Sequence, residues 1–201
     1  VRWYLCRAHT QGGIMVLWSK VKNVFVPSNG TEQPQKATFA TREDTIYAPV
    51  SGVLVSVQEV HDEVISSGLF GQGYGILPVG LDCVYAPCNA RVTATNVTNH
   101  SIGLTTDTGI EILIHIGVGT IEMNGKGFTR YVHANDEVKA GTPLISFDAA
   151  AIEEAGYENV VVVTVVNADQ YERIDLIGES GTLIGGRPLV KIGDPLMCVK
   201  H

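Results

Sequence analysis

The sequence lacks runs of basic residues, long apolar runs and cysteines at metal-binding spacing. Its 14 Lys and Arg residues against 21 Asp and Glu residues give a net charge of −7, which argues against a nucleic-acid surface. The most apolar stretch, Val160 to Val166, is far shorter than the roughly 20 residues that span a bilayer. We therefore expect neither nucleic-acid binding nor a membrane-spanning segment.

The cysteines show no CxxC spacing and no companion histidines of the zinc-finger kind. They are Cys6, Cys83, Cys88 and Cys198. Isolated, buried thiols in a reducing compartment account for this scatter, so the sequence predicts a cytoplasmic protein.

A polar boundary divides the chain. Residues 27–44 carry two prolines and predict a flexible linker between an N-terminal extension, 1–26, and a domain over 45–201. Within the extension, residues 15–26 place Leu17, Trp18, Val21 and Phe25 on one helical stripe and contain two lysines but no acidic residue. This pattern predicts an amphipathic helix that makes weak contact with a membrane surface. The alternatives are packing on the domain or disorder, because twelve residues are marginal for an isolated helix.

From Thr45 onward, short β-branched runs alternate with Gly, Pro, Asn and Asp. The predicted strands are 46–57, 75–79, 90–97, 101–105, 110–118, 143–147, 160–166 and 188–192. Such spacing is typical of an all-β antiparallel sandwich or barrel. Two short helices are predicted, over 149–155 and 169–177.

Two histidines stand out within this pattern. If Asp107-Thr108 forms a two-residue hairpin loop, His100 lies directly opposite His115 on the neighbouring strand. Opposed side chains have Cβ atoms about 4.5 to 5.5 Å apart, so both rings can converge on one small group. A one-residue slip would put the rings on opposite faces. The sequence thus predicts a histidine pair that performs chemistry.

The sequence resembles a known family over Ile46 to Lys200. The matching stretches are Ala48-Pro49-Val50-Ser51-Gly52, Phe70-Gly71-Gln72-Gly73, Thr98-Asn99-His100, Glu111 to Gly117, Thr120-Ile121-Glu122, Gly125-Lys126-Gly127-Phe128 and Val161 to Thr164. In this order they are similar to the IIA protein of the glucose family of the bacterial phosphoenolpyruvate:sugar phosphotransferase system. The resemblance implies a β-sandwich of the duplicated hybrid motif type.

The resemblance also implies a phosphoryl carrier that accepts its group from phosphorylated HPr and passes it to a cysteine on the IIB domain of a sugar permease. His115 matches the phosphorylated histidine, His100 its neighbour, and Thr98 the hydroxyl that orients that neighbour. Asp62 matches an acidic residue at the rim of the same face. The matches to an apolar docking patch are Val64, Ile65, Leu69, Phe70 and Leu113.

The chemistry of the residues agrees with these roles. A neutral imidazole is a competent nucleophile near pH 7, and a second imidazole can stabilise charge on the phosphoryl oxygens. A backbone carbonyl near Gly117 is expected to hold the proton on the other nitrogen of His115. The chain departs from the family at Gly119, where an acidic residue that would face a basic residue of the donor is usual.

Two other functions remain open. A zinc hydrolase of related fold would want a His-x-His pair on the strand, but Gly117 stands where the second histidine is needed. No cofactor is required, although His100 and His115 could hold a zinc ion with a carboxylate from a partner. The second alternative is a regulatory module that docks transporters or metabolic enzymes through the apolar face.

Overall fold

The computed structural model describes residues 33–201, which form an antiparallel β structure with short helices. The predicted extension and its helix over 15–26 lie outside the described residues, as does the first part of the predicted linker. Residues 33–44 contain no helix or strand, and the Ala37 N–H donates to the Gly141 carbonyl at 2.9 Å. Within 33–201, no helix has both the length and the apolar character needed to cross a membrane.

The strands are short and the helices shorter. The strands are β1 Thr45–Tyr47, β2 Gly52–Ser56, β3 Gln72–Pro78, β4 Cys83–Tyr85, β5 Ala90–Thr95, β6 Ser101–Thr105, β7 Glu111–Val118, β8 Phe128–Arg130, β9 Glu137–Val138, β10 Pro143–Phe147, β11 Glu158–Val165, β12 Arg173–Leu176, β13 Leu183–Ile184, β14 Arg187–Val190 and β15 Pro195–Lys200. The helices are α1 Glu63–Ser66 and α2 Ala149–Glu154, with 3-10 turns η1 Val57–Glu59, η2 Thr120–Met123 and η3 Ala168–Gln170.

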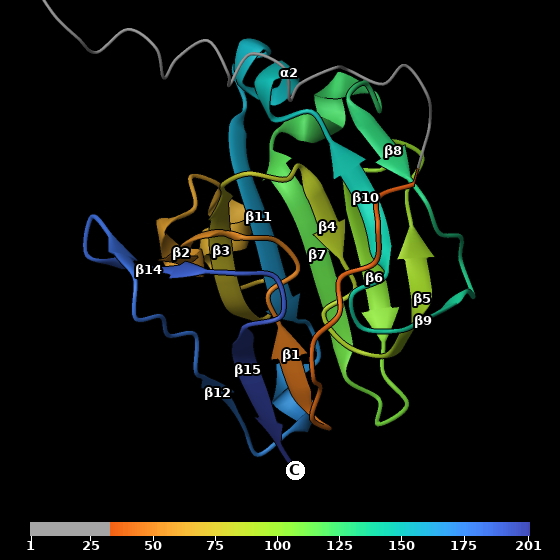
Figure 1. Cartoon of the computed structure of the whole chain (residues 1–201), viewed down its shortest axis with the longest axis vertical. Helices are drawn as coiled ribbons and strands as arrows, with labels where there is room; N and C mark the ends of the chain where they lie inside the picture. The colour runs from red at the N-terminus through yellow and green to blue at the C-terminus, as the bar shows by residue number, and fades with distance from the viewer. Residues whose placement is uncertain (1–32) are drawn as a thin grey trace, which may run out of the picture. The chain divides into compact units, whose positions relative to one another are not determined.

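A nine-stranded sheet organises the described part of the chain, in the order β13-β14-β2-β3-β11-β7-β6-β5-β9. Two three-stranded sheets, β1-β15-β12 and β4-β10-β8, accompany it. Figure 1 shows β4 and β10 across the long strands β7 and β6, and side chains of both sheets share one buried cluster. The fold is therefore an open antiparallel sandwich, as the sequence predicts.

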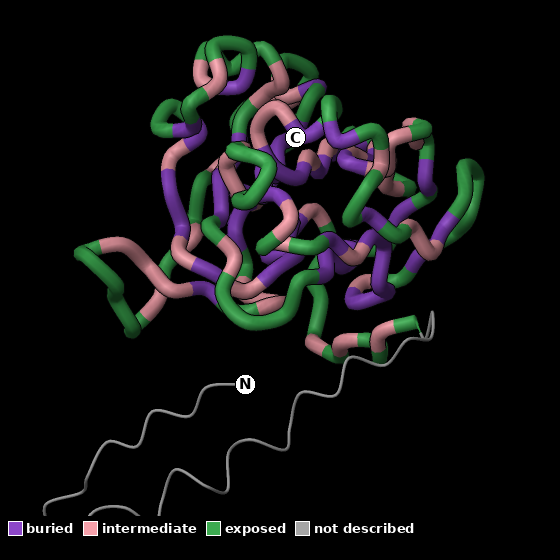
Figure 2. Tube along the Cα trace, turned by 90° about the horizontal axis from the view of Figure 1, so that it is seen from above, coloured by how far each residue is buried: buried purple, intermediate pink, exposed green. Residues whose placement is uncertain are grey.

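The core lies between these sheets. From β7 it receives Ile112, Ile114 and Ile116, and Ile110 joins them just before the strand. All four are buried, because alternation along the strand directs every second side chain into the core. Figure 2 shows the buried residues gathered in the interior of the described part of the chain, with exposed residues concentrated in its outer turns.

The other face of the nine-stranded sheet carries a second, smaller cluster. It contains Val55, Val57, Val60, Ile65, Val160 and Val162, with Phe70 and Val118 packed against it. Because β11 is covered on both faces, every residue from Val160 to Val165 is buried, which explains its continuous apolar sequence. His115 pairs with Val162 and so belongs to this second face.

The β6–β7 hairpin corrects the predicted register. Ser101, and not His100, lies opposite His115. The loop has three residues instead of two, because Gly109 takes a positive φ of 86° and Thr106 exchanges hydrogen bonds with Ile110 across it. A glycine in this conformation closes a three-residue hairpin, whereas a two-residue loop at Asp107-Thr108 would pair Gly109 with Thr106.

The helix predictions have different outcomes. The helix over 149–155 is confirmed as α2, whose N-cap Asp148 accepts a hydrogen bond from the Ala151 N–H. The helix over 169–177 is wrong, because only the turn η3 forms and β12 follows. Ile174 is buried in β12 and pairs with Val199 of β15, so sheet pairing prevails over local helix preference.

Candidate functional site

The site is centred on His115 of β7, between β6 and β11. Its cross-strand neighbours are Ser101 on β6 and Val162 on β11. Because side chains alternate along a strand, the isoleucines on either side of His115 enter the core while the imidazole faces the second cluster. The strand thus holds a polar ring on an otherwise apolar face.

His100 reaches the same place from outside the strand. It precedes β6 and follows Asn99, whose φ of 55° is left-handed, and its carbonyl accepts from the Ile116 N–H at 2.8 Å. Its ring centroid lies 5.0 Å from that of His115, and the two planes meet at 73°. The predicted convergence is therefore present despite the one-residue slip, because strand alternation does not govern a residue in the preceding turn.

Polar groups of the 96–101 segment surround His100. Thr98 Oγ1 lies 2.6 Å from His100 Nδ1, which is the predicted neighbour contact. Sequence reasoning missed Asn96, whose Nδ2 lies 3.4 Å from the same ring nitrogen and 2.6 Å from Ser101 Oγ. The available signal was its position four residues before His100 in a polar turn.

Burial dominates the electrostatics of the pair. The pKa of His115 is lowered to about 4, chiefly by burial and secondly by the nearby His100, while the Asp62 carboxylate and the Gly117 backbone act in the opposite direction. Burial also lowers the pKa of His100. Both rings are therefore neutral near pH 7, which leaves each with one nitrogen lone pair.

The two nitrogens of His115 have different surroundings. Nδ1 is buried and has no hydrogen-bond partner of full geometry within residues 33–201. The backbone of Gly117 nevertheless raises the pKa of the ring, as a long, imperfectly aligned contact would do. Such contacts often tighten when a reacting group is bound. Since Nδ1 faces the interior, Nε2 is the nitrogen that offers its lone pair.

Apolar side chains and one carboxylate surround the pair. The Phe70 ring stacks beside His115 at 6.4 Å between centroids. Leu113 is half-buried on the His115 side of β7, while Val64 and Leu69 are exposed, Leu69 to 75%. Asp62 caps α1 by accepting from the Val64 and Ile65 N–H groups at 2.9 Å.

One predicted docking residue does not reach the surface. Ile65 is only 2% exposed and lies within the second cluster. The first turn of α1 directs it inward, whereas its neighbour Val64 points to solvent. The assignment of Ile65 to a partner-contacting rim is therefore corrected: its side chain supports the rim from beneath.

Comparison with known proteins agrees with this geometry. The profile of the phosphoenolpyruvate-dependent sugar phosphotransferase system, EIIA 1, matches residues 44–171. The chain belongs to this IIA family. The matched region contains both histidines.

Individual relatives are similar over most of the chain. The β-glucoside-specific EIIBCA component of Bacillus subtilis (strain 168) is 41% identical over 146 residues, or 73% of this chain and 24% of that protein. The glucose-specific EIIA component of Staphylococcus aureus (strain COL) is 32% identical over 157 residues, which are 78% of this chain and 94% of that protein. The chain thus spans about a quarter of the β-glucoside-specific relative and almost all of the glucose-specific one.

A solved structure shares the fold. The glucose permease IIA from Mycoplasma capricolum superimposes with a TM-score of 0.62 at 27% identity, covering 76% of this chain and 93% of that one. The open sandwich seen here is thus the IIA fold. The IIA family match ends at residue 171, so β12 to β15 lie beyond it.

Gly119, where the family resemblance leads one to expect an acidic residue, occupies a constrained position. It is the N-cap of η2 with a φ of 75°, and a Cβ added there would lie 2.7 Å from the Tyr157 ring. A side chain would require both a left-handed backbone and displacement of Tyr157. An acidic residue at position 119 would therefore require changes in the backbone and in Tyr157, so Gly119 differs from it by more than a missing carboxylate.

The histidine pair offers two ligands to a metal ion. Among residues 33–201, no group of three or more His, Cys, Asp or Glu side chains could hold one. A zinc ion at His100 and His115 would need further ligands from a partner or from water. The zinc site stays a prediction that depends on such a partner.

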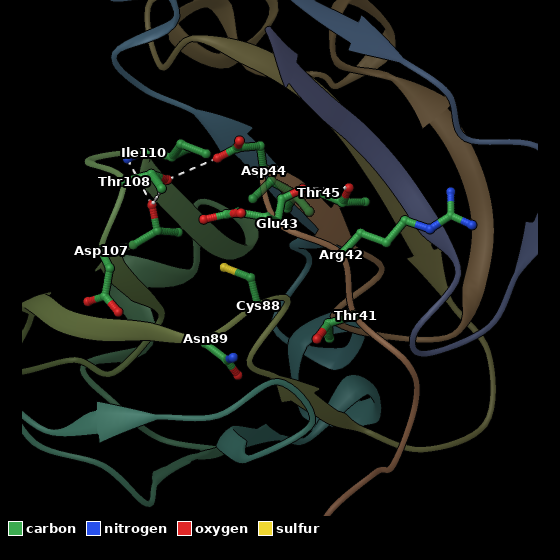
Figure 3. Close-up of a pocket in the computed structure, with 12 residues that line it drawn as sticks. Thr41, Arg42, Glu43, Asp44, Thr45, Cys88, Asn89, Asp107, Thr108 and Ile110 are labelled. Atoms are coloured by element: carbon green, nitrogen blue, oxygen red, sulfur yellow. Dashed lines mark hydrogen bonds between the residues drawn. The ribbon is translucent and has the colours of Figure 1, made fainter. Parts of the chain in front are cut away.

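A polar hollow lies elsewhere, at the start of β7. Figure 3 shows Thr108 beside Asp44, at 3.0 Å between oxygens, with Cys88 in the same wall. Its volume is about 230 Å³, and none of the predicted site residues lines it. Burial raises the pKa of the Cys88 thiol to about 12, so it is not a nucleophile near pH 7. The histidine pair remains the candidate site of this IIA domain.

Proposed function

We propose that this chain is a phosphoryl carrier of a sugar phosphotransferase system. It accepts a phosphoryl group from phosphorylated HPr on His115 and passes it to a cysteine on the IIB domain of a sugar permease. The observation that carries the proposal is the pair of neutral imidazoles with ring centroids 5.0 Å apart on an apolar face. The names of the relatives favour a glucose-type or β-glucoside-type permease.

The first step is attack by the His115 Nε2 lone pair on phosphorus. A nitrogen–phosphorus bond forms, and the bond between phosphorus and the donor atom of HPr breaks, with its electron pair leaving on that atom. Because the folded protein keeps His115 neutral near pH 7, the nucleophile needs no prior deprotonation. In the second step, a cysteine thiolate of IIB attacks phosphorus and the electron pair of the broken bond returns to Nε2.

His100 assists both steps by stabilising charge. Its ring meets that of His115 edge-on, so its Nε2–H can donate to a phosphoryl oxygen. Thr98 Oγ1, 2.6 Å from His100 Nδ1, holds the ring in place. Catalysis of phosphoryl transfer consists mainly of positioning and stabilisation of charge on the equatorial oxygens, which is the help that a second imidazole gives.

The surrounding apolar residues have two roles in this proposal. Phe70 and Leu113 limit water access to the phosphohistidine, while Val64 and Leu69 form the exposed part of a docking surface. The Asp62 carboxylate at the rim meets a basic residue of the partner. Because both partners use one face, HPr and IIB bind in turn and not together. We place the reaction in the cytoplasm, where free thiols persist and phosphoenolpyruvate is made.

The test is intact-mass analysis after mixing the chain with phosphoenolpyruvate, the general phosphotransferase enzyme and HPr at neutral pH. We expect a gain of one acid-labile phosphoryl group, which is absent in His115→Gln. His133→Gln is the matched control, because His133 is exposed in a loop away from the pair. No gain in the unchanged chain, with an active donor system, would refute the carrier function.

A further inference from the structure

Asn96 makes contact with two groups that face His115. Its Nδ2 lies 2.6 Å from Ser101 Oγ and 3.4 Å from His100 Nδ1. A carboxamide nitrogen carries two hydrogens, one for each of these acceptors. Its Oδ1 is buried and has no hydrogen-bond partner within the described part of the chain. The cost of burying this oxygen is therefore not offset by a hydrogen bond. Such an uncompensated polar atom requires an explanation.

Ser101 is the side chain directly across from His115. The Ile116 N–H donates to the His100 carbonyl, so His100 and Ile116 form the hydrogen-bonded pair of the antiparallel ladder. The next pair, Ser101 and His115, is then the non-hydrogen-bonded kind, whose Cα atoms are only about 4.5 Å apart. The Ser101 hydroxyl therefore stands beside the imidazole.

The contact with His100 bears on which ring nitrogen carries the proton. Thr98 Oγ1 is 2.6 Å from Nδ1, but a hydroxyl can either donate or accept, so Thr98 fits both tautomers. The Asn96 amide nitrogen can only donate. A proton on Nδ1 would point at these donor hydrogens, whereas a lone pair on Nδ1 attracts them. The amide therefore favours the tautomer in which Nε2 carries the proton.

The same argument applies to Ser101. Its Oγ accepts a hydrogen from Asn96, so its own proton is free to point elsewhere. Because Ser101 lies directly opposite His115, this proton can be donated to an oxygen of a phosphoryl group on His115. Three equatorial oxygens share the charge in phosphoryl transfer, and two donors on one side of the group would stabilise two of them.

We propose that Asn96 is a positioning residue whose amide aims two donors, His100 Nε2–H and Ser101 Oγ–H, at the phosphoryl group on His115. The inference rests on the proposed carrier function. In this proposal Asn96 determines which nitrogen of His100 carries the proton. Thr98 adds a second hydrogen bond to Nδ1 but does not determine the tautomer.

The direct test determines the His100 tautomer in the unphosphorylated 201-residue chain. Two-bond proton–nitrogen correlation spectra of histidine-labelled protein at pH 8 distinguish protonated from unprotonated ring nitrogens. We expect Nε2–H in the unchanged protein and in Thr98→Val. In Asn96→Asp we expect the proton on Nδ1, because a carboxylate of the same shape can only accept.

The control is Asn167→Ala, which removes an equally structural asparagine away from the pair. Asn167 accepts from the Glu111 N–H and donates to the Gly109 carbonyl, both at 3.0 Å. We expect this variant to lose stability without altering the His100 tautomer. Backbone amide spectra establish that each variant is folded. Retention of Nε2–H in Asn96→Asp, or its loss in Thr98→Val, would overturn the assignment to Asn96.

A kinetic readout links the tautomer to transfer. We expect Ser101→Ala and Asn96→Asp each to slow transfer to IIB by about tenfold or more, since each removes a hydrogen bond to a charged group. Unchanged transfer in both variants would refute the role of the two donors. Failure of the unchanged protein to take up any phosphoryl group would refute the carrier function instead, and the tautomer spectra would still decide whether Asn96 positions His100.

Discussion

At the scale of single residues, burial prepares His115 for its proposed chemistry. The apolar surroundings lower its pKa to about 4, so the ring is neutral and nucleophilic near pH 7. Among residues 33–201, no group forms a full hydrogen bond with its buried Nδ1. The phosphoryl group would add negative charge to this weakly solvated face, which is why the neighbouring donors matter.

For His100→Gln we expect the two transfer steps to separate. Acceptance from HPr survives at least partly, because His115 and its lone pair remain, while transfer to IIB slows by about tenfold to a hundredfold as charge stabilisation changes. Single-turnover mixing with phosphorylated HPr, and then with IIB, measures each step. Equal and total loss of both steps would contradict this division of roles.

At the scale of elements, the end of β7 determines what can stand near the histidines. Gly117 and Gly119 both have a φ of 75°, and η2 starts immediately after them. A Cβ on Gly117 would clash with Thr120 Cγ2, and Thr120 Oγ1 donates to the Ile116 carbonyl at 2.6 Å. The turn therefore packs tightly against the strand that carries His115.

We predict that Gly119→Asp, which introduces the acidic residue expected from the family resemblance, destabilises the protein. The left-handed backbone costs about 1 kcal/mol for a non-glycine residue, and the contact with Tyr157 adds about 1–3 kcal/mol. Gly156→Asp is the matched control, since its φ is 81° but a Cβ there meets nothing within 4 Å. Urea unfolding of both variants measures the difference. Equal free energies of unfolding would show that Tyr157 yields without cost.

At the scale of the whole molecule, the buried histidine makes folding sensitive to acid. The folded pKa of His115 is about 4 against an ordinary value of 6.5, so the unfolded chain binds the proton more readily between these values. Stability is therefore unaffected by this group above pH 6.5 and falls as the pH decreases through that window toward 4. The depressed pKa of His100 acts in the same direction.

We expect His115→Gln to flatten this dependence. A pKa difference of this size corresponds to about 3 kcal/mol of stability lost by pH 4. Between pH 7 and pH 4, the free energy of unfolding should therefore decrease by about 3 kcal/mol less in the variant than in the unchanged protein. Urea denaturation at several pH values between 7 and 4 measures it, with His133→Gln as the exposed control. Parallel curves for the His115 variant and the unchanged protein would contradict the effect of burial.

Some elements could be predicted from the sequence and others could not. β6 and β10 have the predicted bounds, because alternation and flanking turn residues mark them locally. β15 was missed and β12 was predicted as helix, since each is defined by pairing with the other. Such pairing joins segments that local propensity describes separately.

For the site, the sequence by itself determined the residue types, the isoleucine core face of β7 and the family motifs around His115. Only the tertiary structure decided the register, the burial of Ile65 and the position of Asn96. The reason is that alternation is a local property of a strand, whereas the rings meet through a left-handed turn at Asn99 and a three-residue hairpin loop. Those features depend on backbone conformations and contacts that residue patterns do not specify.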